Sequence, residues 1–277
     1  PITFSQVVGQ EHITDTLQRQ VAEGRTGHAY LFTGTRGTGK TTCARILAKA
    51  INCLHPVDGA PCNQCEACRG IDEGRLLDIT ELDAASNNGV DSVRALREEA
   101  VYTPSVLKKR VYIIDEVHML STPAFNALLK ILEEPPEHLV FILATTELHK
   151  VPATILSRCQ RYSFKRILPR DIARQLRYIA GEEQIDLTPD GADILARMAG
   201  GAMRDALSLL DQCRSFEGTL SASAILNLLG LAGGVQTARL MELLLKRDAR
   251  EALLLLDQLY RDGKDIAALL RELSDLC

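Results

Sequence analysis

The segment Gly34–Thr41, which reads GTRGTGKT, constrains this chain more than any other part of its sequence. It follows the apolar run Ala29–Phe32 and precedes a helical pattern from Thr42, which is the strand-to-helix context of a phosphate-binding loop. The alternative is a Gly-rich turn that only connects a strand to a helix. In a phosphate-binding loop, backbone N–H groups surround the phosphates, a lysine reaches the β- and γ-phosphates, and a hydroxyl coordinates Mg²⁺. We therefore expect a nucleoside triphosphate and Mg²⁺ to be held by Gly34, Thr35, Arg36, Gly37, Thr38, Gly39, Lys40, Thr41 and Thr42.

Composition limits the class of protein and the cellular compartment that we expect. A chain of 277 residues with 46% hydrophobic and 25% charged residues is long enough for two or three globular domains. Its net charge of −4 argues against a polycation, so any contact with nucleic acid is expected on a local face. Neither a secretory leader nor an apolar stretch of about 18 residues is visible, which favours a cytoplasmic protein with no membrane partner. Because the chain begins at Pro1 and ends within an amphipathic run, we expect a fragment of a longer protein.

The first part of the chain alternates short apolar runs with helical patterns. Strands are predicted at Ala29–Thr33, Leu77–Leu82, Val111–Asp115 and Val140–Thr145, which indicates an α/β fold with a parallel sheet. Residues 52–70 interrupt this alternation with a stretch rich in Cys, Pro, Gly and Asn, as a small inserted module would.

Strand patterns disappear beyond Pro169, and apolar residues recur there at helical spacing: Ile172, Leu176, Ile179, Ala180, Ile194, Leu195 and Met198. Breaks at Thr219–Ser223 and at 232–234 precede further helices. Their apolar faces are predicted at Leu253, Leu256, Tyr260, Ile266, Leu270, Leu273 and Cys277. The sequence thus predicts an α/β domain at 1–168 with the module at about 52–70, a helical domain at 169–231 and the start of a third domain at 232–277.

An acidic pair follows the apolar run Val111–Ile114 at the carboxyl end of a predicted strand, where open α/β sheets bind ligands. Asp115 is a candidate Mg²⁺ ligand. Glu116 is a candidate base that orients and deprotonates the attacking water. A solvated turn or a helix cap is the alternative. Residues 115–118, which read DEVH, also resemble a helicase box, so this pair alone does not identify the kind of motor.

Other candidates remain open on the residues alone. Thr145 and Thr146 end the strand predicted beside the metal strand, where a hydroxyl could contact the γ-phosphate, although threonine is common in strands. Arg158 is either a surface charge or an arginine finger for a neighbouring subunit's nucleotide, and its spacing alone favours the surface role. Arg204 begins a helix after two glycines and could reach back toward the phosphates.

The cysteines indicate a metal site. Cys62, Cys65 and Cys68 have the spacing of a zinc knuckle, and Cys53 supplies a fourth thiolate for a closed tetrahedral Zn²⁺ site that would fold the insert. The alternatives are His55 in place of Cys53 and a reduced cluster without metal. The other cysteines are interpreted as small apolar packing residues: Cys43, Cys159, Cys213 and Cys277.

Direct reading of bases is not indicated, because the chain has six Tyr, six Phe and no Trp. The basic cluster Lys108–Arg110 could equally be a solvated loop before a strand. Any contact with a duplex is therefore expected through phosphates, independent of base order.

Taken together, these motifs resemble the gamma/tau family of bacterial DNA polymerase III, the ATPases of the sliding-clamp loader. The resemblance covers essentially the whole chain. It rests on the phosphate loop, the four-cysteine insert, Asp115–Leu120 (DEVHML), Leu128–Pro136 (LLKILEEPP), Ser157–Cys159 and Arg204–Leu207 (RDAL). It implies an AAA+ module with a five-stranded parallel sheet, a helical lid and the beginning of a helical collar through which five subunits associate.

The resemblance also implies roles for single residues. Arg158 would be the arginine finger that acts on an adjacent subunit's ATP, and Arg204 the lid sensor of the γ-phosphate. Thr146, with Thr145 beside it, would be the sensor at the end of the fourth strand. Val7 and Val8 belong to a segment that would cradle adenine, mostly through backbone atoms. The departure from the family is at the end, where the collar stops near its third helix and the tau-type tail is absent, so assembly of this fragment is open.

The implied partners are further gamma/tau copies, the delta and delta prime subunits, the beta sliding clamp and primer-template DNA. ATP binding would open the clamp on primed DNA, and hydrolysis would release it around the duplex. The rival hypotheses are a translocating helicase, a clamp-loader scaffold without turnover and a small-molecule phosphotransferase. The helical pattern after Pro169 and the complete set of phosphate loop and Glu116 argue against the first two. No second acidic pair suited to nucleotidyl transfer is visible, so we expect no polymerase site.

Overall fold

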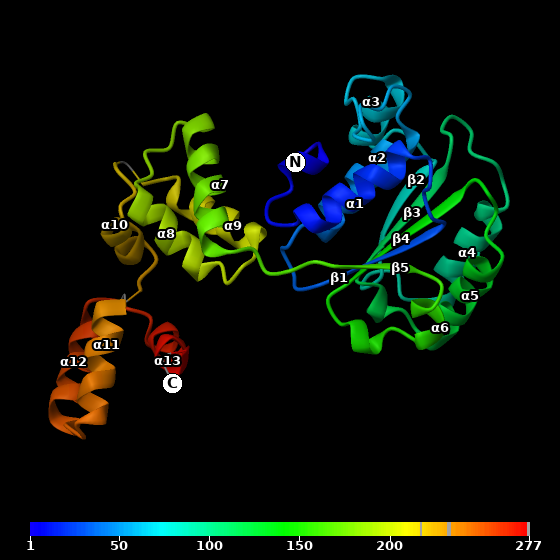
Figure 1. The fold of residues 1–277 in the computed structure, drawn as a ribbon. Helices are drawn as coiled ribbons and strands as arrows, with labels where there is room; N and C mark the ends of the chain where they lie inside the picture. Colours follow the sequence, from blue (N-terminus) through cyan, green and yellow to red (C-terminus); the bar gives the residue numbers. More distant parts are fainter. Residues whose placement is uncertain (217, 232–233, 276–277) are drawn as a thin grey trace. The chain divides into compact units, whose positions relative to one another are not determined.

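A computed structural model of the chain describes residues 1–216, 218–231 and 234–275 (Figure 1). It consists of two compact units, Pro1–Asp171 with Gly201–Arg204, and Ile172–Gly200 with Asp205–Cys277. Residues 232–233 of the break expected at 232–234, and Cys277 of the predicted apolar face, lie outside the described residues.

The first unit is built on a five-stranded sheet in the order β2-β3-β4-β1-β5, in which every pairing is parallel. This confirms the predicted α/β fold with a parallel sheet. Strand β4 lies between β3 and β1, so the carboxyl ends of these three strands are neighbours. The strands are β1 (Ala29–Thr33), β2 (Ile79–Asp83), β3 (Arg110–Asp115), β4 (Leu139–Thr145) and β5 (Gln160–Ser163).

Four strands differ from the sequence-based expectation. β3 and β4 each begin one residue before the predicted start, at Arg110 and Leu139. β2 begins at Ile79 and not at the predicted Leu77, whose side chain is 86% exposed. β5 was not predicted from the residue pattern, because its four residues, QRYS, contain one apolar side chain. It is an edge strand that pairs only with β1, so its side chains need not be apolar on both faces of the sheet.

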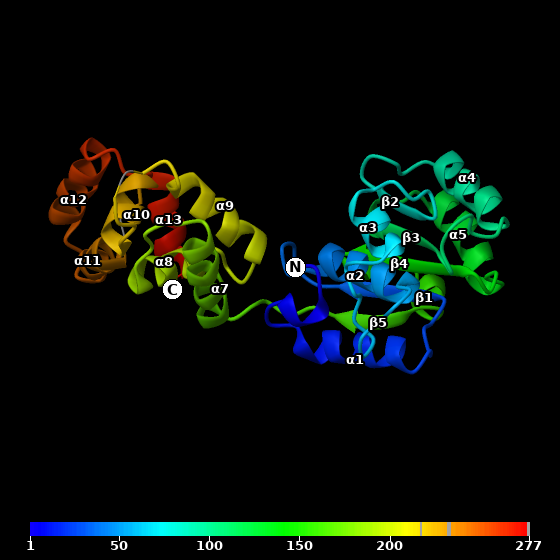
Figure 2. The same ribbon diagram turned by 90° about the horizontal axis from the view of Figure 1, so that it is seen from above.

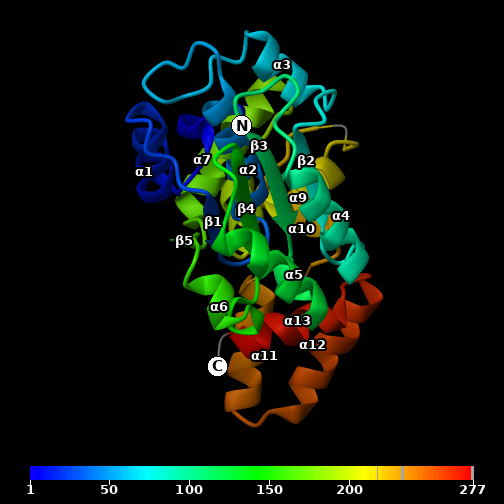
Figure 3. The ribbon, with the colours of Figure 1, turned by 90° about the vertical axis from the view of Figure 1, so that its right-hand side faces the viewer.

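Helices cover both faces of the sheet, as Figures 2 and 3 show from two directions. On β3, Val111 and Ile113 pack in one core with α1 (Glu11–Ala22) and α2 (Lys40–Asn52). The alternate residues Tyr112 and Ile114 pack in a second core on the opposite face. The helices of that face are α4 (Val90–Ala100), α5 (Thr122–Glu133) and α6 (Ala153–Leu156).

Short elements complete the unit. The cysteine-rich insert contains a helix, α3 (Glu66–Asp72), in its second half, which the sequence pattern did not indicate. Three single-turn 3₁₀ segments lie elsewhere: η1 (Phe4–Gln6), η2 (Val117–Met119) and η3 (Leu148–Lys150).

Within the described residues, the second unit consists of helices, as expected. Ile172 and Leu176 of α7 are buried, in agreement with the predicted face, whereas Met198 is 37% exposed. The helices are α7 (Pro169–Glu182), α8 (Pro189–Met198), α9 (Met203–Cys213), α10 (Ala222–Leu228), α11 (Gly234–Leu245), α12 (Ala249–Arg261) and α13 (Ile266–Asp275). None of the helices in the described residues combines the length and apolar character needed to cross a bilayer.

The predicted inner faces of the last two helices are partly wrong. In α12 the buried residues are Ala252, Leu255 and Leu259, one position earlier than predicted, and Leu253 and Tyr260 are 65% and 71% exposed. Likewise Leu269, and not Leu270, is buried in α13. Residues 252–256 read ALLLL, so helical spacing fits more than one set of buried residues, and packing against α11 and α13 selects one.

A buried carboxylate organises the loop before β3. Asp78 is 1% exposed and accepts hydrogen bonds from the backbone N–H groups of Ser105, Val106 and Leu107 at 2.9–3.0 Å, while Arg110 donates at 3.3 Å. Burial raises the pKa of Asp78, but these donors outweigh it and hold the pKa below its usual range. The basic cluster is thus tied to protein groups, since Lys108 also donates to the Cys53 carbonyl at 3.0 Å.

Asp78→Asn is expected to lower the free energy of unfolding by about 2 kcal/mol at pH 7, because an amide presents its own N–H groups to these donors. A native pKa below the unfolded value of about 3.9 means that this stabilisation is complete above that value and is lost as pH falls through the native pKa. Denaturant unfolding at several pH values measures the difference. Asp91→Asn, at a side chain 93% exposed, is the control. A difference that stays constant down to pH 3 would contradict this account.

Candidate nucleotide site and zinc module

The phosphate loop connects β1 to α2, which begins at Lys40, two residues before the predicted start. Gly39 precedes the helix with φ +101°, a conformation that L side chains rarely adopt, and it has no side chain to cap the helix. The N–H groups of the first turn therefore keep their capacity to bind an anion, which the helix dipole also favours. The local geometry is that of a phosphate site.

Lys40 lies within this loop with 6% of its surface exposed. Its Nζ donates to the carbonyl oxygens of Gly34 and Thr35 at 2.8 and 2.9 Å. Burial lowers the pKa of Lys40, and the nearby carboxylates of Glu116 and Asp115 partly counter this. The ammonium group is thus held beside both candidate acidic residues.

Thr41 and Asp115 converge from α2 and β3. The Thr41 hydroxyl donates to Asp115 Oδ2 at 2.6 Å, across 74 residues of sequence. A hydroxyl and a carboxylate next to a phosphate site are hard oxygen donors, the type that Mg²⁺ prefers. The residues present therefore fit the expected magnesium site.

Glu116 follows Asp115 in a left-handed conformation, with φ +47°. Its Oε2 accepts hydrogen bonds from both the hydroxyl and the backbone N–H of Thr146, at 2.9 and 3.1 Å. The candidate base and the candidate sensor are therefore in direct contact at the ends of β3 and β4. Backbone strain of this kind, on the order of 1–3 kcal/mol, persists where the surroundings fix it, as in functional sites.

Thr145 is completely buried and faces a different partner. Its Oγ1 lies 3.0 Å from His118 Nδ1 and accepts the N–H of Glu147 at 3.1 Å. The other ring nitrogen, Nε2, lies 3.0 Å from Glu147 Oε2. Sequence reasoning assigned no role to His118 or Glu147, although His118 was visible as the last letter of DEVH.

Arg158 follows the short helix α6. Its guanidinium donates to Glu133 Oε1 at 2.8 Å and to the Thr154 carbonyl at 2.7 Å, and 33% of the side chain is exposed. Within the described residues of this chain it is thus paired at the surface and not in contact with the phosphate loop.

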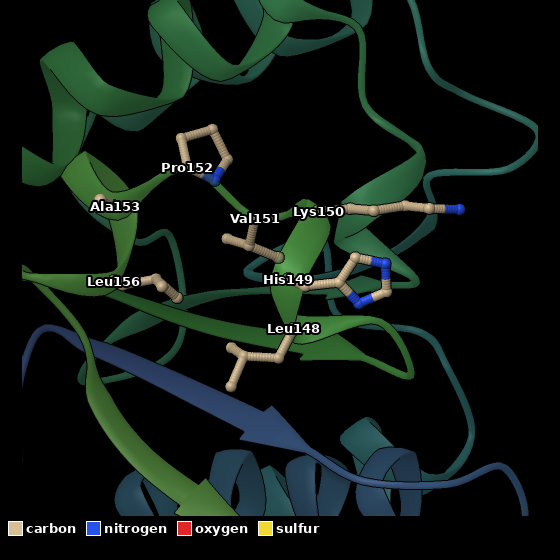
Figure 4. A pocket seen from close by; sticks show the side chains of 7 residues that line it. All are labelled: Leu148, His149, Lys150, Val151, Pro152, Ala153 and Leu156. Carbon is tan, nitrogen blue, oxygen red and sulfur yellow. The ribbon is translucent and has the colours of Figure 1, made fainter.

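An open hollow lies along the segment between the two threonines and Arg158. Figure 4 shows the side chains of His149 and Lys150 at its edge, directed outward from the ribbon. Among the described residues, those that line it include none from the phosphate loop, so this hollow is not the nucleotide site. The lining residues are Leu148, His149, Lys150, Val151, Pro152, Ala153 and Leu156.

Residues Gly201–Arg204 belong to the first unit and approach the phosphate loop. The N–H of Met203 donates to the Gly37 carbonyl at 2.9 Å. A methyl group on Gly37 would lie 2.8 Å from Ala202 Cβ and 3.4 Å from Arg204 Cβ, so a side chain at this position would clash. The Cβ atom of Arg204 therefore lies close to the loop, and the residue is exposed.

The N-terminal segment also reaches the loop. Val7 is 6% exposed, and its Cγ1 would lie 3.4 Å from a Cβ on Gly39; Val8 is half-buried. Gln10, the last residue of the segment predicted to cradle adenine, is fully buried. It donates to the Lys165 carbonyl at 2.7 Å and accepts the Lys165 N–H at 3.1 Å, which fixes the segment beside the sheet.

The insert brings its cysteines together. The Sγ atoms of Cys53, Cys62, Cys65 and Cys68 all lie within 4.8 Å of one another, a spacing that tetrahedral Zn–S bonds of about 2.3 Å can span. Backbone N–H groups of Cys62 and Cys65 point at the sulfurs of Cys53 and Cys62, at 3.3 and 3.4 Å. Such donors favour thiolates. Burial raises the pKa of Cys65, but N–H groups and neighbouring thiols lower it to about 6. His55 is not part of this group.

A buried lysine of α2 forms hydrogen bonds with the insert and with α3. Lys49 is 2% exposed, and its Nζ bonds Asn63 Oδ1 and Asp72 Oδ2 at 2.8 and 2.9 Å. Cys43 and Cys213 are fully buried, as expected for apolar packing residues. Cys159 is partly buried and packs against the second core.

The sheet order, with a phosphate loop after β1 and an acidic pair after β3, places the first unit in the AAA+ class of P-loop ATPase folds. A solved structure of the Thermotoga maritima RuvB Holliday junction branch migration motor supports this fold, with a TM-score of 0.64 and 17% identity over 88% of this chain and 78% of that one. Family models match DNA polymerase III, delta subunit (residues 9–167), the DNA polymerase III clamp loader subunit ATPase lid domain (171–216) and DNA polymerase III subunits gamma and tau domain III (220–277). The chain belongs to the DNA polymerase III gamma/tau family.

Curated relatives agree. The chain is 51% identical over 275 residues to DNA polymerase III subunit tau of Bacillus subtilis, which covers 99% of this chain and 49% of the relative. It is 45% identical over 277 residues to DNA polymerase III subunit tau of Escherichia coli, which covers 100% of this chain and 43% of the relative. The chain thus spans about half the length of these relatives.

Metal analysis of the purified chain is expected to find about one zinc per molecule. Cys53→Ser should lower the zinc content and weaken resistance to a chelator, because three thiolates leave the site open, whereas His55→Ala should retain the metal. Loss of zinc from His55→Ala together with retention in Cys53→Ser would assign the fourth ligand to the histidine.

Proposed function

We propose that this chain is the ATP-hydrolysing motor part of a clamp loader, which uses ATP to open a sliding clamp and load it onto primed DNA. The observation that carries the proposal is the convergence of Lys40, Thr41, Asp115, Glu116 and Thr146 at one edge of the sheet. Membership of the gamma/tau family supports it.

The geometry supports the following roles. The loop Gly34–Thr42 would bind the triphosphate through backbone N–H groups, with Lys40 as a point charge near the β- and γ-phosphates. Thr41 and Asp115 would hold Mg²⁺, which neutralises phosphate charge when bound. Val7 and Val8 would line the adenine site, because Val7 lies beside Gly39 at the start of α2 and Val8 follows it in the chain.

Glu116 is the candidate for orienting and deprotonating the attacking water. Its carboxylate accepts two hydrogen bonds from Thr146, so the candidate base and the candidate sensor are in direct contact. A γ-phosphate that takes the Thr146 hydroxyl as a donor would free Glu116 to face the water. Thr145, tied to His118, would support this pair and not contact phosphate itself. Arg204, which starts close to Gly37, would read the γ-phosphate from the lid side.

Arg158 would act in trans on an adjacent subunit's ATP. Its contact with Glu133 is partly exposed and therefore weak, so the guanidinium can leave it at little cost. Further gamma/tau copies, the delta and delta prime subunits, the beta clamp and primer-template DNA, bound through phosphates, would be the partners, in the cytoplasm. The Zn²⁺ site would fold the insert and take no part in hydrolysis.

Glu116→Gln should retain ATP binding and lose turnover by ~10²-fold or more, because the amide keeps the shape of the side chain but not its basicity. Calorimetry measures the first quantity and phosphate release the second. Glu182→Gln, an exposed change near the end of α7, is the control. Normal turnover in Glu116→Gln would remove this residue from the mechanism.

Arg158→Ala in the full-length protein, assembled with clamp-loader subunits, clamp and primed DNA, should lose most of the DNA-stimulated ATPase, by ~10³-fold if the finger role holds. Nucleotide affinity of the separate subunit should not change. Glu133→Ala removes the same ion pair but leaves the arginine, so it should keep the stimulation. Arg161→Ala, on the exposed edge strand, is the second control. An unchanged stimulated rate in Arg158→Ala would assign the arginine to the surface, and strand separation by wild-type protein alone would favour a helicase.

A further inference from the structure

His118 is a buried imidazole to which the proposed mechanism gives no task. It lies on η2, directly after the acidic pair, and its side chain is 6% exposed. Both ring nitrogens face polar groups of other segments, so its orientation is fixed from two sides.

The contact with Glu147 defines the protonation of one ring nitrogen. Nε2 lies 3.0 Å from Glu147 Oε2. A hydrogen bond from Lys150 holds the pKa of Glu147 below its usual range, so this carboxylate is ionised and can only accept. Nε2 must therefore carry a hydrogen.

The other end faces the candidate base. Nδ1 lies 3.0 Å from Thr145 Oγ1 and 3.3 Å from Glu116 Oε2. The Thr145 oxygen already accepts the Glu147 N–H at 3.1 Å, which leaves its own hydrogen available to Nδ1. The same Glu116 oxygen is the one that Thr146 holds by two hydrogen bonds.

Two neighbours thus limit the position of Glu116 Oε2. Thr146 holds it by two hydrogen bonds, and the Nδ1 edge of His118, an acceptor that does not attract a carboxylate, closes the other side. When Thr146 turns its hydroxyl to a γ-phosphate, its share of this constraint falls. The imidazole, anchored by Glu147 and Thr145, then remains as the group that limits where the carboxylate can move. A misplacement of a reacting group by about 1 Å can cost ~10²-fold in rate.

We propose that His118 is a positioning residue for Glu116, held in register by Glu147 and Thr145. The inference rests on the proposed ATP hydrolysis and adds a residue to it. The series of contacts from Glu147 through His118 to Glu116 joins the start of η3 to the candidate nucleotide site. We expect it to affect turnover directly and ATP affinity not at all.

The test uses the full-length protein with single-turnover ATP hydrolysis and ATP affinity measured for each variant. His118→Ala should lower the rate by ~10- to 100-fold with the affinity unchanged within about threefold. His118→Asn, whose amide reaches the position of Nδ1, should recover more of the rate than His118→Gln, whose amide reaches the position of Nε2. An equal loss of rate and affinity, or no loss, would overturn the proposal.

Glu147→Ala tests the contact with His118 Nε2 from a half-buried site. It keeps the proposal testable if the His118 variants do not fold. It should lower the rate, and combining it with His118→Ala should lower the rate no further than His118→Ala alone, because both act through one ring. The matched control is His149→Ala: this histidine is 75% exposed and lies 4.0 Å from the same carboxylate. It should hydrolyse ATP as wild type does, and a loss equal to that of Glu147→Ala would overturn the assignment to His118.

A readout independent of turnover separates this inference from the proposed function. In protein labelled with ¹⁵N-histidine, Nε2 of His118 should carry the proton, and the Nδ1 signal should shift in Glu116→Gln and on addition of ATP with Mg²⁺. Absence of hydrolysis by wild type in the complete assembly would refute the proposed function without changing these signals. An Nδ1 signal insensitive to Glu116→Gln would refute the contact itself.

Discussion

The placement of β4 between β3 and β1, with all strands parallel, is the constraint on which the candidate nucleotide site depends. Parallel strands end at the same edge of a sheet, so the phosphate loop, the acidic pair and the threonine pair become neighbours although they lie far apart in sequence. The N-terminus of α2 then adds unsatisfied N–H groups at the same point. Chemistry on a triphosphate needs positioned charges more than covalent catalysis, and this edge of the sheet supplies them.

Buried and partly buried polar groups at this edge satisfy one another. Lys40 donates to loop carbonyls, Thr41 to Asp115, Thr146 to Glu116, and His118 faces Glu147. Such networks are costly when half satisfied and rigid when complete, which explains why a residue in a left-handed conformation is tolerated at Glu116. The proposed ATP hydrolysis is consistent with a site whose parts are preorganised and in which Glu116 and Thr146 share hydrogen bonds.

Local sequence patterns predicted much of the fold. β1 was predicted at its observed bounds because its five residues are all apolar or small and all buried, and the cysteine insert followed from ligand spacing. β5 escaped prediction because an edge strand of polar residues has no periodic signal. The register of α12 was misassigned because its run of leucines satisfies several helical faces, and burial against α11 and α13 decides between them.

By itself the sequence determined the glycine-rich loop, the four-cysteine insert, the acidic pair and the alternation that makes a parallel sheet, because each is encoded within short stretches of the chain. Only the tertiary structure decided that Thr41 meets Asp115, that Glu116 rests on Thr146 and not on Thr145, and that His118 is clamped by Glu147. These contacts depend on strand order and on the burial of both sheet faces. Both are collective results of packing, which no single stretch of the chain specifies.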